Sequence, residues 1–353
     1  MKIRPLIIAL CALAGCAPEI YDHTTKGHFD NQAIQRIVEE QVKSAKETLR
    51  PKAMVVVVAE PKTGKILAIS GYERESAANL GSNSALAGSL MFEPASTFKP
   101  MTAVAALESG TINPETKIFC ENGSFTHAGQ IISDSRPLGD LNFDEILAAS
   151  SNIGASKMAF TIDDETYYDY VRKFGFGEKS GLSIPTESGG LVQPPAQWDA
   201  LTKARMAFGQ NVAVTPIQLT MAYCALANGG LLMKPVIGDG MPKVVRRVCS
   251  EGTANLVKNA LQAAPEEPMT PASQARGVVV GGKTGTALAI NSKGGYLPDQ
   301  VCTMFVGFFP VKDPEYVITV VVDDANVPPE KNYGGLIAAP IFEEIGGKIL
   351  NLQ

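Results

Sequence analysis

Long hydrophobic runs, histidine and clustered basic residues are all scarce in this 353-residue chain. The apolar stretch from Leu6 to Gly15 is too short to span a bilayer. Two of the three histidines, His23 and His28, lie near the N-terminus and show no metal-ligand spacing, so we expect no metal and no cofactor. Lysine and arginine are scattered and do not alternate with aromatic residues, which argues against nucleic-acid binding.

The composition is that of a globular protein with a substantial core, since 45% of residues are hydrophobic and 19% are charged. A net charge of −5 is mild and indicates solubility rather than a charged partner. Four cysteines follow the N-terminal region, and the sequence does not decide their pairing. Cys224 and Cys302 lie in apolar runs, so we expect these two to be buried free thiols.

The N-terminus reads as a targeting segment. Lys2 and Arg4 precede the apolar stretch, which ends Leu13-Ala14-Gly15-Cys16. This ending resembles the lipobox of bacterial lipoproteins, which implies cleavage before Cys16 and acylation of its thiol. An ordinary secretory signal with an incidental cysteine is the alternative. Both interpretations place the mature domain outside the cytoplasm, on the periplasmic side, and the lipobox adds anchoring to a membrane.

The order of elements predicts an α+β fold. Helical spacing covers residues 31–49 and 334–350, and residues 93–261 are mostly helical. Strands are predicted at Ala53–Ala59, Lys65–Ser70, Gly277–Gly281, Cys302–Phe309 and Tyr316–Val322. We therefore expect an antiparallel sheet of about five strands, covered by the N- and C-terminal helices and interrupted by a large helical insertion.

This order also predicts the domain boundaries. Residues 1–15 form the signal peptide and residues 16–30 a tether. Residues 31–353 form one domain, with a sheet part at 31–90 and 276–353 and a helical part at 91–275.

The first chemical motif is Ser96-Thr97-Phe98-Lys99. Ser96 lies at a predicted helix start, where free N–H groups favour developing negative charge. The i, i+3 spacing brings Lys99 onto the same face, where it can take the Ser96 proton. Such a base needs a pKa of ~7–8 rather than the usual ~10.4 for lysine, which burial or a second cation supplies. The alternative is a helix-capping serine and a solvated lysine.

Two further motifs complete a set suited to acyl transfer through a serine ester. In Ser150-Ser151-Asn152, Ser150 can relay a proton to a leaving group and Asn152 can hold Lys99 or a substrate amide. A helix cap or turn is the alternative role.

The third motif is Lys283-Thr284-Gly285-Thr286. Lys283 and the Thr286 hydroxyl can bind a substrate carboxylate, and the backbone N–H groups of Thr286 and Ser96 can form an oxyanion hole. Gly285 and its neighbours allow an extended substrate to approach the strand. The alternative is a polar hairpin edge. Tyr296, which follows in a Gly-rich stretch, is a candidate to overhang the groove.

Together the motifs resemble the penicillin-binding proteins, specifically the transpeptidase domain of the class B, monofunctional group, within the serine β-lactamase and transpeptidase superfamily. The resemblance rests on Glu93–Pro100, Ala149–Gly154, Phe208-Gly209-Gln210 and Phe305–Phe308, and it extends from about Ile34 to Leu350.

This resemblance implies a peptidoglycan D,D-transpeptidase. Ser96 would attack the D-alanyl-D-alanine end of a donor stem peptide, and an amine of an acceptor stem peptide would resolve the acyl-enzyme. Ser96, Lys99, Ser150, Asn152 and Lys283 would be catalytic, Thr284, Gly285 and Thr286 would bind substrate, and β-lactams would acylate Ser96.

The chain departs from the class B pattern upstream of the domain. Class B proteins usually carry a membrane helix and a pedestal domain there, whereas only Cys16–Lys52 precede the first strand here. We expect a lipid at Cys16 and the tether to take their place. A membrane glycosyltransferase is a possible partner.

Three other functions fit parts of the pattern. Pro94–Lys99 also resembles the class D serine β-lactamases, although these typically have Val at the position of Asn152. A D,D-carboxypeptidase would use the same residues and pass the acyl group to water. A β-lactam sensor or cell-wall scaffold is the non-enzymatic alternative.

Overall fold

The computed structural model describes residues 31–74, 84–182, 184, 186–263, 278–290 and 296–352. The signal peptide, Cys16 and the tether lie outside these ranges, so the lipid anchor stays a prediction. Among the helices of the described residues, none combines the length and apolarity needed to cross a membrane.

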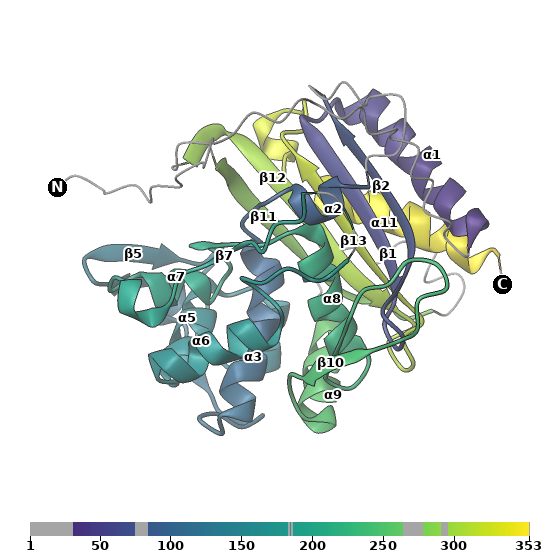
Figure 1. Cartoon of the computed structure of the whole chain (residues 1–353). Helices are drawn as coiled ribbons and strands as arrows, with labels where there is room; N and C mark the ends of the chain where they lie inside the picture. The colour runs from purple at the N-terminus through teal and green to yellow at the C-terminus, as the bar shows by residue number, and fades with distance from the viewer. Residues whose placement is uncertain are drawn as a thin grey trace, which may run out of the picture.

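A five-stranded antiparallel sheet forms the framework of the domain (Figure 1). Its strands are β1 (Ala53–Glu60), β2 (Lys65–Glu73), β11 (Gly281–Ile290), β12 (Tyr296–Phe309) and β13 (Tyr316–Asp323). The spatial order is β11-β12-β13-β1-β2, so the two ends of the chain interleave and β11 forms one edge. β1 lies inside the sheet and every residue except Glu60 is buried, which is why its sequence is an unbroken apolar run. The expected fold class is confirmed.

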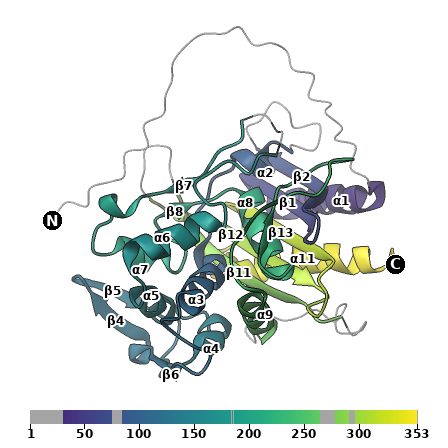
Figure 2. The same ribbon diagram turned by 60° about the horizontal axis from the view of Figure 1, so that its bottom comes forward.

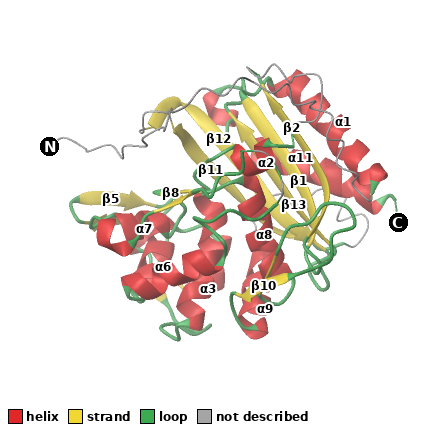
Figure 3. Ribbon diagram, in the orientation of Figure 1, coloured by secondary structure: helices red, strands yellow, loops and turns green. Residues whose placement is uncertain are grey.

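Two helices cover one face of this sheet, as Figure 3 shows in red against yellow. These are α1 (Gln32–Leu49) and α11 (Gly334–Leu350). Asn31 begins α1, because its side chain accepts a hydrogen bond from the backbone N–H of Ile34 at 3.1 Å. Phe342 of α11 packs on Phe305 of β12 with ring centroids 4.6 Å apart. The aromatic contact docks the C-terminal helix on the sheet.

The other face packs on α8 (Pro216–Ala227), in which every residue is buried. A capping box between Thr215 and Gln218 starts this helix. The described residues of this part also form the helices α2 (Leu86–Ser89), α3 (Lys99–Glu108), α4 (Phe143–Ala148), α5 (Asn152–Phe160), α6 (Asp164–Lys173), α7 (Thr202–Met206) and α9 (Glu251–Ala260). Short 3₁₀ turns lie at η1 (Ala95–Phe98), η2 (Glu121–Gly123), η3 (Pro195–Gln197), η4 (Leu261–Ala263) and η5 (Pro329–Lys331).

Short antiparallel ribbons also occur in this helical part, and the sequence pattern did not indicate them. They pair β3 (Ile118–Phe119) with β6 (Asp140–Leu141), β4 (Ser124–His127) with β5 (Gln130–Ser133), β7 (Leu191–Val192) with β8 (Val212–Ala213), and β9 (Leu231–Met233) with β10 (Val244–Arg247). Figure 2 shows α3 and α5 on the β11 side of the sheet, and the 3₁₀ turn η1 that precedes α3 contacts β11. The sheet and the helical part therefore meet at β11.

One predicted strand is wrong in its position. Gly277–Gly281 was expected to be a strand, but β11 begins at Gly281, and Gly277 lies outside the described residues. The reason is the register with β12, where Gly281 pairs with Phe308. β12 ends at Phe309, one residue past this pair, and Pro310 has no N–H to continue the ladder. Val279 instead accepts from the N–H of Val311 at 3.0 Å, outside the strand pairing. The motif at 283–286 consequently lies inside the strand.

The four cysteines of the domain are all buried and free. This confirms the expectation for Cys224 and Cys302, and it answers the open question of pairing for Cys120 and Cys249. None of these four thiols forms a disulfide, so packing holds the described elements together.

The docking of α11 gives a first test. Phe342→Ala removes a buried ring that contacts Phe305, so we expect a loss of about 3–5 kcal/mol in the free energy of unfolding. Leu336→Ala on the same helix is the control, because Leu336 is 47% exposed and its truncation should change little. Urea denaturation measures both. A loss below about 1 kcal/mol for Phe342→Ala would show that α11 is not anchored by this ring.

Candidate active site

Ser96 and Lys99 come together at the junction of η1 and α3. The Nζ of Lys99 donates a hydrogen bond to the Oγ of Ser96 at 2.9 Å. Lys99 is fully buried, whereas Ser96 is partly exposed. Ser96 lies in the 3₁₀ turn and not in the first turn of the α-helix, because α3 itself begins at Lys99. The pair has the geometry of a nucleophile beside a base.

Ser150 completes this cluster from a distant part of the chain. The Nζ of Lys99 donates to the Oγ of Ser150 at 3.0 Å and also to the Ser150 carbonyl oxygen. The Lys99 Nζ therefore lies between the two serine hydroxyls, close enough to exchange a proton with either. Ser150 has a φ of 53°, a left-handed conformation that is uncommon for residues other than glycine. Such strain is typical of functional positions.

The turn that carries Ser96 is braced from two directions. Ala95 has a φ of 47°, and its N–H donates to the carbonyl of Gly209 at 3.0 Å. A Cβ at Gly209 would lie 2.1 Å from the Ala95 oxygen, so only glycine fits there. From α8, the hydroxyl of Tyr223 donates to the carbonyl of Thr97 at 2.9 Å. The buried helix α8 thereby positions the turn that carries Ser96.

The second motif is organised by Asp134, a residue that the sequence reasoning missed. Its carboxylate accepts from the Ser151 hydroxyl at 2.6 Å and from the backbone N–H groups of Asn152 at 2.6 Å and Ile153 at 3.2 Å. A carboxylate at the start of α5 satisfies free N–H groups and complements the helix dipole. The Asn152 side chain donates to the carbonyl of Ser133 at 3.0 Å. Its proposed contact with Lys99 or with substrate stays a prediction.

The side chains of the third motif lie on both faces of β11. Lys283 pairs with Val306 and Gly285 with Met304, and both partners belong to the core on the α8 side. Paired residues share a face, so Lys283, which is buried, points toward the helical part.

Thr284 and Thr286 lie on the opposite face of β11, toward α11. The Thr286 hydroxyl accepts from the Gly334 N–H at 3.0 Å, at the first residue of that helix. Binding of a substrate carboxylate by Thr286 stays a prediction.

Gly285 has a structural reason besides substrate approach. A Cβ there would lie 2.9 Å from the Pro94 carbonyl oxygen and 2.8 Å from Met304. The edge strand β11 and the turn before Ser96 can pack closely because this side chain is missing. The edge strand and Ser96 are thus neighbours, an arrangement that would suit an extended peptide.

Glu93 is a second residue that the sequence reasoning did not single out. It lies three residues before Ser96 and is buried. Its Oε1 accepts from the N–H of Asn211 at 2.8 Å, and the Tyr296 hydroxyl donates to its two oxygens at 3.0 and 3.1 Å. Burial raises the pKa of Glu93 to about 7, although Asn211, Tyr296 and the charge of Arg205 oppose this effect.

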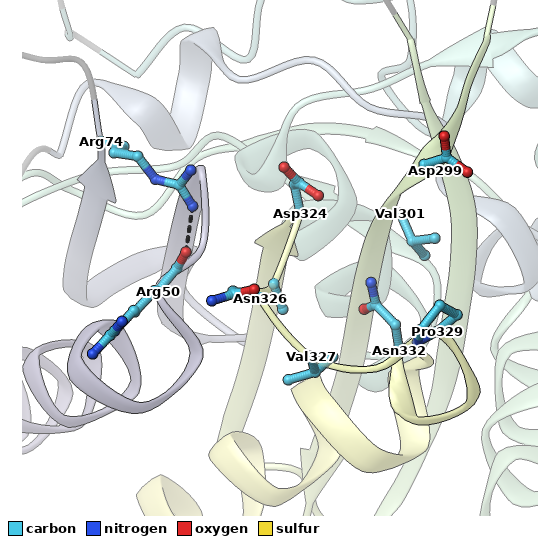
Figure 4. A pocket seen from close by; sticks show the side chains of 10 residues that line it. Arg50, Arg74, Asp299, Val301, Asp324, Asn326, Val327, Pro329 and Asn332 are labelled. Carbon is cyan, nitrogen blue, oxygen red and sulfur yellow. Dashed lines mark hydrogen bonds between the residues drawn. The ribbon is translucent and has the colours of Figure 1, made fainter.

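A cavity of about 590 Å³ lies at one end of the sheet, away from this cluster (Figure 4). Arg74 donates to the Arg50 carbonyl at its rim, and the Asn332 side chain lines it. Its walls contain positively charged, negatively charged and amide side chains, and they include neither Ser96 nor Lys99. Ser96 and Lys99 therefore lie at the junction with β11 and do not line this cavity.

Comparisons with known proteins agree with this geometry. The family model described as "Penicillin binding protein transpeptidase domain" matches residues 54–346. The chain is 32% identical over 333 residues to Stage V sporulation protein D of Bacillus subtilis, covering 88% of this chain and 51% of that protein. It is 30% identical over 330 residues to the probable peptidoglycan D,D-transpeptidase PenA of Neisseria meningitidis, covering 91% and 56%. The chain therefore spans about half the length of the curated relatives it matches.

Solved structures give the same result. The transpeptidase domain of penicillin-binding protein 3 from Burkholderia pseudomallei aligns with a TM-score of 0.80 and 31% identity, covering 90% of this chain and 94% of that one. Penicillin-binding protein 3 from Mycobacterium tuberculosis, complexed with aztreonam, aligns with a TM-score of 0.77 and 30% identity, covering 90% and 77%.

The role of Asp134 predicts a stability effect. Asp134→Ala leaves two N–H groups and a hydroxyl without their acceptor, so we expect unfolding to become easier by about 2–4 kcal/mol. Asp163→Ala is a matched control, because Asp163 is a local cap that accepts from Thr166 at the exposed start of α6, and its loss should cost about 1 kcal/mol. Equal losses in urea denaturation would show that Asp134 is an ordinary cap.

Glu93 predicts a pH-dependent stability. A carboxyl whose pKa rises from 4.5 to about 7 on folding is charged and buried above pH 7, which costs roughly 3 kcal/mol. Below pH 4.5 Glu93 is neutral in both states and the cost vanishes. Glu93→Gln should therefore be more stable than the wild type at pH 8, and this difference should shrink as pH falls to 5. Denaturation at both pH values measures it, and a constant difference would contradict the shift.

Proposed function

This chain belongs to the penicillin-binding protein transpeptidase domain family, and from that premise we propose that it is a peptidoglycan D,D-transpeptidase acting through an acyl-enzyme at Ser96. The observation that carries the proposal is the Lys99 amine within hydrogen-bond distance of both Ser96 and Ser150. A serine with a buried amine base and a second hydroxyl is the arrangement that serine ester chemistry uses.

In the first half-reaction, the Ser96 Oγ attacks the carbonyl carbon between the two D-alanines of a donor stem peptide. Lys99, in its neutral form, takes the Ser96 proton at 2.9 Å. The C–N bond then breaks, and the proton passes from Lys99 through Ser150, 3.0 Å away, to the departing D-alanine amine. The products are free D-alanine and an ester on Ser96.

In the second half-reaction, the amine of an acceptor stem peptide attacks that ester. Lys99 and Ser150 take the amine proton and return it to the Ser96 oxygen as the ester bond breaks. A new amide joins the two peptides and the enzyme is regenerated. β-Lactams would acylate Ser96 by the first step alone, as their presence in structures of similar proteins supports.

Substrate binding is proposed for the edge of β11. Lys283 would hold the terminal carboxylate, and the backbone N–H groups of Ser96 and Thr286 would stabilise the oxyanion. The Thr284 and Thr286 hydroxyls lie on the other face of β11, so they would reach the carboxylate only around the open edge of this strand. Gly285 supports close approach of the donor peptide, since it removes a side chain at the contact with the Ser96 turn. Asn152 would bind the peptide amide, because its half-buried side chain begins α5 next to Ser150.

We also propose the location and extent of the catalytic unit. Residues 31–353 would form it, with sheet parts at 31–90 and 276–353 around the helical part at 91–275. Cleavage after Gly15 and acylation of Cys16 would anchor it on the extracytoplasmic side of a membrane, tethered by residues 16–30. A domain anchored in this way would reach peptidoglycan and a membrane glycosyltransferase partner.

The proposed reaction is tested with a stem pentapeptide ending in D-alanyl-D-alanine and a D-amino acid as the acceptor amine. We expect release of D-alanine and a peptide in which the acceptor replaces it, detected by mass spectrometry. Ser96→Ala and Lys99→Ala should each lower the rate by at least about 100-fold, because the nucleophile or its base is missing. Lys157→Ala is the control, since Lys157 of α5 pairs with Glu121 of η2 and its amine donates there and to the Phe119 carbonyl rather than to Ser96 or Ser150.

The products separate the alternatives. Hydrolysis without amine incorporation would identify a D,D-carboxypeptidase, and rapid turnover of nitrocefin would identify a β-lactamase. Absence of both peptide products from folded wild-type protein would contradict the proposal and favour a sensor or scaffold.

A further inference from the structure

Three segments that are distant in sequence meet at the Glu93 carboxylate. Glu93 itself precedes the turn of Ser96, Asn211 lies in the loop after α7, and Tyr296 is the first residue of β12. Asn211 and Tyr296 donate to Glu93 at 2.8 and 3.0–3.1 Å. Glu93 is only 5% exposed, so these contacts replace the water that a carboxylate normally has.

We propose that ionised Glu93 is a positioning residue for the nucleophile: its carboxylate holds β12 and the 209–211 loop against the turn that carries Ser96, and acylation is fastest in this state. The inference rests on the proposed function and assigns a regulating contact to the same site.

The connection from Glu93 to Ser96 is short and stiff. Pro94 and Ala95 separate them, and Ala95 is held in a left-handed conformation by its bond to Gly209. The Pro94 carbonyl lies against β11 at the position where Gly285 has no side chain. A displacement of Glu93 would therefore move Ser96 relative to the strand that is proposed to bind substrate.

Ionisation matters because both neighbours of Glu93 are hydrogen-bond donors. A carboxylate accepts from the Tyr296 hydroxyl and the Asn211 N–H together, with charge-assisted bonds. Protonation of Glu93 places a hydrogen-bond donor on one carboxyl oxygen, and this weakens the hydrogen bonds that Tyr296 and Asn211 donate. The charged and titratable groups that act on Glu93 are Arg205 of α7, which favours the ionised form, and Tyr296. With a pKa of about 7, Glu93 populates both forms near neutral pH.

Tyr296 offers a mild way to break the contact. Its side chain is 45% exposed while its hydroxyl reaches the buried carboxylate, so the ring lies at the surface. Tyr296→Phe removes the donor and keeps the ring. It should fold normally, and it tests the contact even if a change at Glu93 disturbs folding.

The experiment measures the rate constant for acylation by a fluorescent penicillin between pH 5.5 and 8.5. We expect the ratio of wild type to Glu93→Gln to rise on the order of tenfold across this range, with its midpoint near pH 7, as Glu93 ionises. Tyr296→Phe should lose several-fold at pH 8 and little at pH 5.5. Tyr72→Phe, on β2 at the opposite edge of the sheet, should follow the wild type.

The outcomes separate this inference from the proposed function. If the wild type is acylated but Glu93→Gln and Tyr296→Phe both follow its pH profile in parallel, the positioning role is wrong and the proposed function stands. If folded wild type forms no adduct at any pH, the proposed function fails, and this inference fails with it.

Discussion

The arrangement of the site depends on the hydrogen bonds that the buried amine of Lys99 donates. Removing a charged group from water is costly unless its donors are satisfied. Here the satisfying oxygens come from Ser96 on the same turn and from Ser150 in a different segment. The fold must therefore bring these two segments together, and the same contacts that stabilise Lys99 place it between the proposed nucleophile and the proposed proton relay. The folded state and the proposed reaction therefore require the same contacts of Lys99.

The rest of the domain supports that contact from three sides. The buried helix α8 reaches the turn of Ser96 through Tyr223, and Asp134 fixes the start of α5 beside Ser150. The edge strand β11 packs on the same turn because Gly285 has no side chain. Strained backbone at Ala95 and Ser150 is tolerated because these neighbours determine it. In the proposed function, the sheet would supply an edge for substrate and the helical part would supply Ser96, Lys99 and Ser150.

The sequence predicted what local spacing decides. The interval between Ser96 and Lys99 already implies contact on a helical turn, and the apolar run at 53–59 already implies a buried strand. The sequence did not predict contacts between residues that are far apart along the chain. Asp134 lies 17 residues before Ser151, and Tyr296 lies 203 residues after Glu93, so no spacing rule links them. The start of β11 was misplaced because its partner strand decides where pairing ends. The face on which Thr284 and Thr286 lie depends on where α11 packs, which is tertiary information.

The central claim is that Ser96 is the nucleophile that forms a covalent ester. Intact mass of the folded protein after incubation with benzylpenicillin, followed by proteolysis and fragmentation of the modified peptide, tests it most directly. The account predicts the mass of one opened penicillin per chain, located on Ser96 and persisting after the free drug is removed. An adduct on another residue, or the unmodified mass at saturating penicillin, would contradict it.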